Sequence, residues 1–148
     1  MRLEPLSIAA APALLAMMRL MQIDDPWSVP FDEARALAAV ELMLRNPNFG
    51  LAWFLEHDGR HIGYIVLSWD YSLEYGGRNA WVDEFFIFSE FRGKGFGAQA
   101  LELFEQEALA AGATAIHLGV NPGNPAEHLY RRSGFVGHQR YLMTKFLS

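Results

Sequence analysis

The sequence predicts a mixed α/β domain with a predominantly antiparallel sheet, and three observations indicate it. Apolar residues at helical spacing come first, at 7–22 and 32–45. Runs rich in aromatic and β-branched residues follow at 49–56, 61–71 and 79–88. Helix and strand signals then alternate to the end of the chain. This order of elements is typical of one sheet covered by helices.

Capping and breaking residues bound the first two helices. Ser7 is expected to cap the first helix, although Pro12 disturbs its early turns. Asp32 lies near the start of the second helix, and Asn46-Pro47-Asn48 ends it. A short strand at 2–4 is expected to precede both helices.

Two turn dipeptides separate the three strand-like runs. Asp58-Gly59 and Gly76-Gly77 are typical of hairpins, so three consecutive antiparallel strands are expected. The elements expected after them are a helix at 95–111, a short buried strand at 115–120, a helix at 124–133 and one or two strands within 135–146.

Composition narrows the function classes. The 148 residues fit one domain, 1–148, and 51% hydrophobic against 20% charged residues indicates a folded chain. The chain has no cysteine, which excludes a disulfide scaffold, a cysteine zinc site and a cysteine nucleophile. A formal net charge of −5 argues against a nucleic-acid partner and is compatible with a cationic substrate.

No apolar run reaches the ~18 residues of a membrane span, so no membrane association is expected. The apolar stretch 8–18 is interpreted as a buried helix rather than a signal peptide, because Glu4 precedes it and Pro12 interrupts it. We therefore expect a cytoplasmic protein. His57 and His61 flank a hairpin turn and are not spaced as a helical metal pair, so no metal site is expected.

The most informative segment is a glycine-rich turn between a strand and a helix, at 88–98. Gly93, Gly95 and Gly97 alternate with other residues, and Arg92 and Lys94 lie among them. Glycine lets backbone amides approach a ligand closely, and the following helix begins with unpaired N–H groups. The segment therefore predicts a cradle for phosphate or pyrophosphate, with a ligand-free surface turn as the alternative.

Three ligand classes use such a turn. A nucleoside triphosphate requires Ser or Thr after the lysine, but Gly95 follows Lys94. A dinucleotide fits Gly95-x-Gly97-x-x-Ala100 loosely, but the acidic residue expected about 20 residues later is missing from 117–121. Coenzyme A is the third class. The missing acidic residue therefore argues against a nicotinamide-dependent enzyme.

Two motifs in 81–135 resemble the GNAT superfamily of N-acetyltransferases. Arg92-x-x-Gly95-x-Gly97 matches its Arg/Gln-x-x-Gly-x-Gly/Ala hallmark. The second motif is a strand ending in Asn, then Ala, Leu-Tyr and Gly-Phe, here Asn121, Ala126, Leu129-Tyr130 and Gly134-Phe135. The segment 82–88 also resembles a strand of diamine acetyltransferases that carries acidic residues.

The resemblance implies a GNAT-like fold with a V-shaped split between two parallel strands, 81–88 and 115–120, and acetyl-CoA as cosubstrate. It further implies a set of cofactor-binding residues: Phe85, Phe86 and Ile87 for the pantetheine arm and thioester, Arg92, Gly93, Lys94, Gly95, Phe96, Gly97 and Ala98 for the pyrophosphate, and Asn124. Many relatives are dimers, so the resemblance also implies a homodimer.

Amine acetylation requires a base for the amine, a donor for the oxyanion and a proton for the thiolate. Tyr130 is the candidate acid, because the resemblance places it near the thioester, and a core tyrosine is its alternative role. Asp83 and Glu84 are the candidate bases. Strand alternation sends them to opposite faces, and we favour Asp83 for the acceptor side, with Glu84 facing the helices. Without a cysteine, direct transfer is the simpler route.

The expected acceptor is a primary amine: a small polyamine- or aminoglycoside-like molecule, or a protein lysine or N-terminus. The side chains expected to bind it lie in the first loop and in the hairpin turn at 71–77; they are Asp24, Asp25, Trp27, Glu74 and Tyr75. Ordinary surface loops are the alternative interpretation of these residues. A non-catalytic acyl-CoA-binding sensor or subunit is the alternative function.

Overall fold

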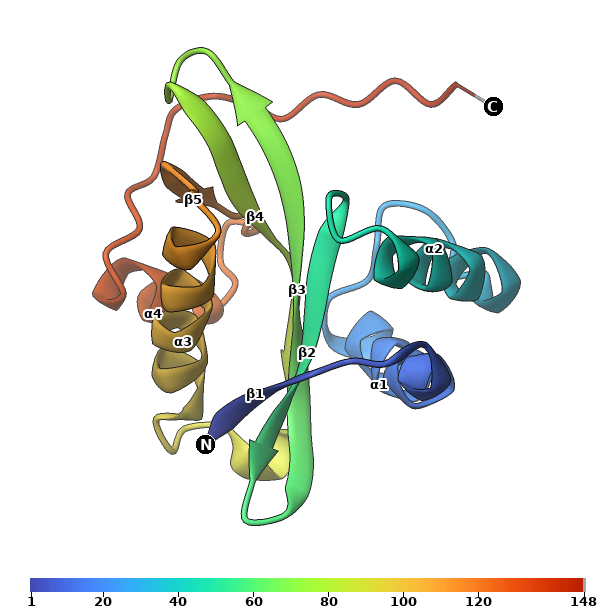
Figure 1. Ribbon diagram of the computed structural model, residues 1–148. Coiled ribbons are helices and arrows are strands. Elements are labelled where there is room, and N and C mark those ends of the chain that lie inside the picture. The colour runs from blue at the N-terminus through green and yellow to red at the C-terminus, as the bar shows by residue number, and fades with distance from the viewer. Residues whose placement is uncertain (148) are drawn as a thin grey trace.

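The computed structural model describes residues 1–147 and shows a sheet between two layers of helices (Figure 1). Helices α1 (Ala11–Asp24) and α2 (Glu33–Arg45) lie on one side, and α3 (Phe96–Ala110) and α4 (Ala126–Arg132) on the other. The strands, in chain order and in sheet order, are β1 (Arg2–Pro5), β2 (Gly50–His57), β3 (Arg60–Ser72), β4 (Gly77–Ile87) and β5 (Ala115–His117). The predicted fold class is confirmed.

The first four strands pair antiparallel in sequence order. The pairs β2–β3 and β3–β4 are those that the two turn dipeptides predict. The final pair is parallel: β5 lies beside β4 with Asn79 opposite Ala115 and Trp81 opposite His117. Strand β5 is shorter than the expected 115–120, because pairing with β4 stops after His117.

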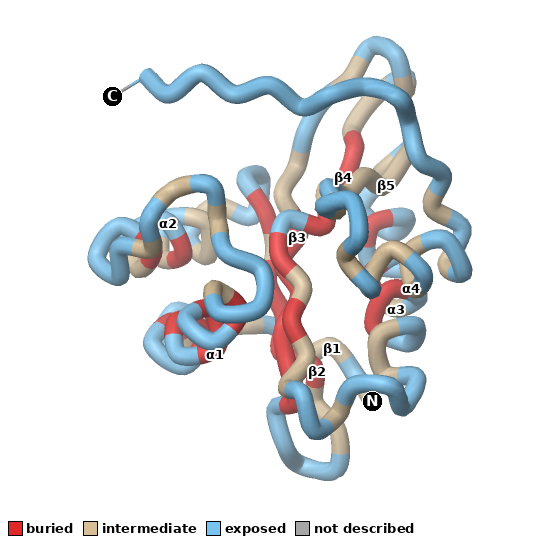
Figure 2. Tube along the Cα trace, turned by 180° about the vertical axis from the view of Figure 1, so that it is seen from behind, coloured by how far each residue is buried: buried red, intermediate tan, exposed pale blue. Residues whose placement is uncertain are grey.

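Each face of the sheet carries its own core, and Figure 2 shows the buried residues concentrated in the strands and the inward sides of the helices. Leu14, Tyr64 and Phe86 belong to the core under α1 and α2. Leu55, Ile65 and Phe104 belong to the core under α3. Strand β4 contributes to both, because successive side chains point to opposite faces.

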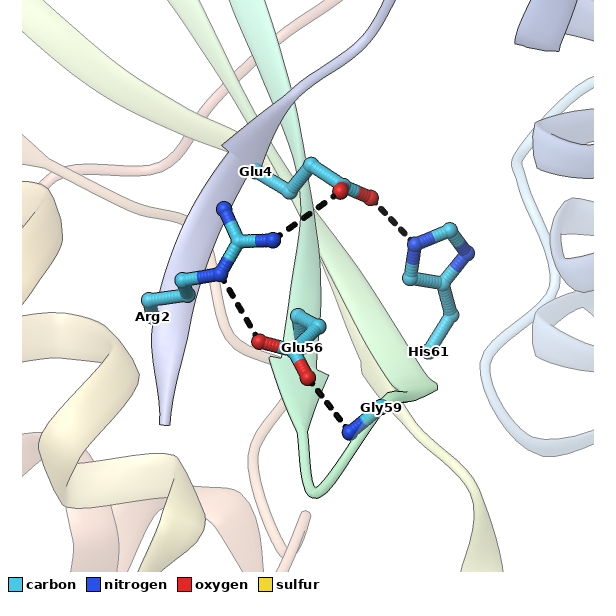
Figure 3. A network of polar contacts seen from close by, with 5 residues as sticks. All are labelled: Arg2, Glu4, Glu56, Gly59 and His61. Carbon is cyan, nitrogen blue, oxygen red and sulfur yellow. Dashed lines mark hydrogen bonds and ion pairs between the residues drawn. The ribbon is translucent and has the colours of Figure 1, made fainter.

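A polar network anchors β1 to the β2–β3 hairpin (Figure 3). Arg2 donates to Glu56 (2.8 Å) and to Glu4 (3.2 Å), and Glu4 contacts His61. Glu56 also accepts from the backbone N–H of Gly59 in the hairpin turn (2.6 Å). The short first strand is therefore held by side chains as well as by its backbone ladder.

The helix starts are partly as predicted. The Asp32 side chain caps α2 by accepting from the N–H of Arg35 at 3.2 Å. Ser7 instead precedes a 3₁₀ turn, η1 (Ile8–Ala10), and its side chain makes no cap hydrogen bond. The α-helix begins only at Ala11, with Pro12 in its first turn, where the missing N–H costs nothing.

The expectation of one or two strands in 135–146 is wrong for this chain. No strand follows α4 in residues 133–147, and 136–147 run as an exposed, extended tail. Arg140 pairs with Glu74 in the β3–β4 turn, at 3.1 and 3.2 Å, so the tail crosses that turn instead of joining the sheet. Within 1–147, no helix combines the length and apolarity needed to cross a bilayer.

Candidate functional site

The site is built where β4 and β5 part. Their pairing ends at Trp81 and His117, whereas β4 continues through Val82–Ile87 without a partner on that side. Backbone N–H and C=O groups along this stretch of edge are left unpaired by the sheet. The predicted split between the two parallel strands is therefore present, and it offers hydrogen-bonding groups to a ligand.

The glycine turn follows β4 and the 3₁₀ turn η2 (Ser89–Phe91) and leads directly into α3. Gly93 and Gly95 adopt φ of +73° and +86°, a region that favours glycine, and a Cβ at either position would meet nothing within 4 Å. No side chain caps α3, and its first turn holds no acidic residue. Its first N–H groups and positive dipole end are thus available to an anion.

Gly97 makes a packing contact that the sequence did not predict. A Cβ there would lie 2.8 Å from the side chain of Leu129. Gly97 therefore lets α4 pack closely against the start of α3. The neighbouring Phe96 ring packs near the rings of His57 and Phe91, with distances between ring centroids of 4.5 Å and 6.3 Å. Phe96 therefore packs against the hairpin end of the sheet.

The two cationic side chains of the turn lie near other residues of the same chain. Arg92 donates to the carbonyl of Ile87 (2.7 Å) and to Asp24 Oδ2 (2.8 Å), and so ties the end of α1 to the end of β4. Lys94 Nζ lies 5.9 Å from the Phe91 ring centroid. Their expected part in pyrophosphate binding stays a prediction, as it does for Gly93, Gly95, Phe96, Gly97 and Ala98.

Asn124 uses its side-chain oxygen locally. It accepts from the N–H of Ala126 at 2.9 Å, at the start of α4. The side chains of Phe85 and Ile87 pack into the core under α3, whereas Phe86 packs under α1. Binding of the cofactor by Asn124 and by the backbone of these strand residues also stays a prediction.

The two neighbouring carboxylates of β4, Asp83 and Glu84, lie where the pairing of the strand is irregular. A bulge in the β3–β4 ladder places Val66 opposite Glu84 and Leu67 opposite Val82, so Asp83 is the extra residue. Asp83 keeps solvent access, although desolvation raises the pKa of its carboxyl. Glu84 is 8% exposed and turns toward α1, the side predicted for it.

Two donors hold the buried carboxylate of Glu84. Trp27 donates from Nε1 to Oε2, and Tyr64 donates from its hydroxyl to Oε1 at 3.1 Å. Burial outweighs these hydrogen bonds and, with the nearby charge of Asp83, raises the Glu84 pKa to about 7. A carboxyl with such a pKa exchanges a proton near neutral pH.

The loop after α1 brings a further carboxylate to the same place. Asn121 Nδ2 donates to Asp25 Oδ1 at 3.4 Å, so this loop reaches the segment after β5. The Asp25 charge also contributes to the raised pKa values of Glu84 and Tyr130. We name this group the Glu84 cluster; its members are Asp25, Trp27, Tyr64, Glu84, Asn121 and Tyr130.

Tyr130 is half-buried on α4, and its ring contacts Phe135 at 6.0 Å. Burial, and to a smaller extent Asp25, raises the pKa of its phenol. Tyr130 therefore keeps its proton at neutral pH. A tyrosine in this state donates a proton rather than accepting one.

The predicted acceptor residues do not all meet. Asp25 and Trp27 belong to the Glu84 cluster, but Glu74 pairs with Arg140 and the Tyr75 ring packs on His117 (4.6 Å). Tyr64 was not predicted, because a tyrosine in a buried strand is usually core and only the fold places it beside Glu84. Within 1–147, no three His, Asp or Glu side chains form a group able to hold a metal.

Comparisons with known proteins agree with this geometry. The sequence model of the acetyltransferase (GNAT) family matches residues 14–135. A comparison with curated proteins gave no significant match. Among solved structures, an integron cassette protein from the mobile metagenome of Cole Harbour Salt Marsh is 29% identical, with a TM-score of 0.85 over 99% of this chain and 91% of that one.

Two further structures share the fold at lower identity. A predicted acetyltransferase from Clostridium acetobutylicum, solved with acetyl-CoA, is 17% identical, with a TM-score of 0.81 over 97% of this chain and 95% of that one. The aminoglycoside N-acetyltransferase AAC(6')-Iy, solved with a bisubstrate analogue of CoA and acetylneamine, is 15% identical, with a TM-score of 0.81 over 99% of this chain and 97% of that one.

Proposed function

This chain belongs to the GNAT acetyltransferase family, and we propose that it moves an acetyl group from acetyl-CoA directly to a primary amine. The observation that carries the proposal is the placement of the Glu84 cluster beside the split between β4 and β5, with the glycine turn at the end of the same strand. Residues 1–148 are proposed to act as one domain.

The glycine turn fits the pyrophosphate of acetyl-CoA. The Cβ positions of Gly93 and Gly95 face open space, and the first turn of α3 presents uncapped N–H groups. Backbone donors at a helix N-terminus bind phosphate oxygens without needing a charged side chain. Binding of this kind does not need the side chain of Arg92, which is engaged with Asp24.

Acetyl-CoA supplies the activated thioester, and the chain's own residues prepare the amine. An amine attacks only as the neutral base, so its proton must be removed. Glu84, with a pKa of about 7, is ionised in a useful fraction at neutral pH and is a stronger base than an ordinary carboxylate. We propose Glu84 as the base, and Asp83, which is exposed at the bulge, as a residue that orients the acceptor.

Tyr130 is proposed as the acid that protonates the departing thiolate. Its raised pKa keeps the phenol protonated, and Asp25 beside it opposes ionisation. A backbone N–H on the unpaired edge of β4, near Phe85, is proposed as the donor to the oxyanion.

The acceptor is proposed to be a cationic small molecule, such as a polyamine or an aminoglycoside, with a protein lysine or N-terminus as second choice. Asp25, Asp83 and Glu84 place three carboxylates around one end of the split, and the Trp27 indole lies beside them. Carboxylates and an aromatic face together favour an ammonium group. The solved complex of AAC(6')-Iy with an acetylneamine analogue supports this choice.

The test is thiol release from acetyl-CoA in the presence of polyamines, aminoglycosides, amino acids and lysine peptides. The chain has no cysteine, so the assay has no protein background. We expect release with one class of amine. Binding of acetyl-CoA without release for any amine would favour the alternative, a non-catalytic acyl-CoA sensor or subunit. Binding of NAD instead of acetyl-CoA would contradict the proposal.

A further inference from the structure

The apolar face of α1 is interrupted by a polar side chain, Gln22. Leu15 and Met18 are buried on this face, and Gln22 follows them at helical spacing. The amide Nε2 of Gln22 is buried without a hydrogen-bond partner in the protein, and in residues 1–147 it is the only buried side-chain polar atom of this kind. An unpaired buried donor lowers the stability of a fold, so packing alone does not account for an amide at this position.

The amide oxygen of Gln22, in contrast, has a defined partner. It accepts from the backbone N–H of Trp27 at 2.9 Å. Trp27 belongs to the loop 25–32 between α1 and α2, which contains no helix or strand. A backbone N–H can only donate, so the oxygen of the amide, and not its nitrogen, faces Trp27. Gln22 therefore fixes the backbone of this loop at Trp27.

The side chain of Trp27 carries this constraint to Glu84. The indole ring is half-buried and packs edge-on against Phe31, with the ring centroids 5.3 Å apart. Its Nε1 donates to Glu84 Oε2. Because Gln22 holds the backbone of Trp27 and Phe31 packs on its ring, the indole has little freedom to turn its N–H away from the carboxylate.

The indole N–H opposes the effect of burial on Glu84. An indole donates but cannot accept, so it stabilises the charged carboxylate more than the neutral carboxyl. The other titratable side chains that influence Glu84 are Asp83 on β4, Asp25 in the loop and Tyr64 on β3. The two aspartates raise the pKa of Glu84, whereas the hydrogen bonds from Trp27 and Tyr64 lower it. Loss of the indole N–H would therefore leave Glu84 protonated at neutral pH, when it could not take a proton from an amine.

We propose that Gln22 is a positioning residue for acetyl transfer: its amide oxygen fixes Trp27, and Trp27 in turn holds Glu84 in the orientation and the charge state that accept a proton from the amine. This inference rests on the proposed function, in which Glu84 is the base. Gln22 acts through two hydrogen bonds, its own to Trp27 and that of Trp27 to Glu84, which join the end of α1 to β4.

The first test is a double-mutant cycle that follows the pH dependence of kcat/KM for the preferred amine. Trp27→Phe removes the indole N–H, and we expect the titration near 7 to move upward by about one pH unit. Gln22→Met has a similar length but no acceptor, and we expect it to move the titration in the same direction by a smaller amount. In the Trp27→Phe background, Gln22→Met is expected to move it no further, because Gln22 acts through Trp27.

A control variant and a melting curve separate positioning from a structural role. Gln106→Met is the same change at an exposed position of α3 and is expected to leave the titration in place. Gln22→Met is expected to change the melting temperature little, since it removes the unpaired Nε2 but deprives the N–H of Trp27 of its acceptor. A lowered melting temperature with an unmoved titration, or an equal shift in both backgrounds of the cycle, would overturn the proposal.

The second test does not depend on acetyl transfer. The side-chain carboxyl carbons of isotope-labelled glutamate are followed by NMR over pH, without acetyl-CoA or amine, and the Glu84 signal is identified by its loss in Glu84→Gln. We expect it to titrate near 7 in the wild type and higher in Trp27→Phe and Gln22→Met. An unmoved Glu84 titration in both variants would overturn the inference. A moved titration in a protein that acetylates no amine would support the hydrogen-bond chain and contradict only the proposed function.

Discussion

The glycine turn and the Glu84 cluster lie at the same end of β4, but the first consists of backbone groups and the second of side chains. The turn offers backbone N–H groups at the start of α3, with no side chain in the way. The cluster depends on a buried carboxylate held by Trp27 and Tyr64. Backbone donors do not change their charge with pH and require no buried charge. Burial of a carboxyl group, in contrast, lowers the stability of the fold, and its charge changes with pH. The cofactor side of the site is therefore expected to be robust, and the chemical side sensitive to pH.

The largest effect is expected from a charge placed in the glycine turn. Gly95→Glu is expected to weaken acetyl-CoA binding by about 1,000-fold, or about 4 kcal/mol, because a carboxylate would face the pyrophosphate. Gly95→Gln is the matched control, since it has the same size and the same strain at φ of +86°. The measurement is calorimetric titration with acetyl-CoA. Equal losses in the two variants would mean that backbone strain, not charge, is responsible.

Loss of the base is expected to be the next largest effect. Glu84→Gln keeps the size of the side chain and is expected to lower kcat about 100-fold, because it cannot take the proton of the amine. Acetyl-CoA affinity is expected to change little, since the cradle does not include Glu84. The corresponding control is Asp83→Asn, for which a smaller loss, mainly in the KM of the amine, is expected. If Asp83→Asn caused the larger fall in kcat, Asp83 would be the base.

Glu84→Gln is also expected to make the folded protein more stable than the wild type at high pH. The folded pKa of Glu84, about 7, lies above its ordinary value of 4.5, so the native state binds this proton more tightly than the unfolded state. The stability contributed by the neutral form is thus present below about pH 4.5 and is lost as pH rises through 7. Relative to Glu84→Gln, the wild-type protein should lose up to about 3 kcal/mol of unfolding free energy between about pH 4.5 and 8.

Urea denaturation of both proteins at several pH values measures this difference. A constant difference between wild type and Glu84→Gln across that range would mean that Glu84 does not change its charge in the folded protein.

The smallest effect is expected at Tyr130. Tyr130→Phe removes the phenolic proton but keeps the ring on Phe135, so we expect kcat to fall about tenfold with little change in thermal stability. Stopped-flow thiol release and a melting curve check both parts. A lowered melting temperature with unchanged kcat would return Tyr130 to a structural role.

The two regions also differ in how far the sequence predicts them. The glycine turn is a local motif, and its position between β4 and α3 and its positive φ values follow from a few adjacent residues. The bulge at Asp83, in contrast, does not follow from alternation along the strand. The approach of Asp25 to Asn121 and Tyr130 joins segments about 100 residues apart, and no local pattern specifies it.

Two features that the sequence did not predict have the same origin. The engagement of Arg92 with Asp24 is a long-range contact that a motif does not contain. The tail carries strand-favouring residues, but a strand needs a paired neighbour, and Arg140 pairs with Glu74 in the β3–β4 turn, where no strand lies beside the tail.

The most direct test of the chemistry is the pH dependence of kcat/KM for the preferred amine, in the wild type and in Glu84→Gln. The wild-type kcat/KM is expected to rise with pH and to show a titration near 7, since Glu84 must lose its proton to act as the base. Glu84→Gln is predicted to be slow at every pH and to lack that titration. A titration near 7 that persists in Glu84→Gln would show that another group is the base and would contradict the role given to Glu84.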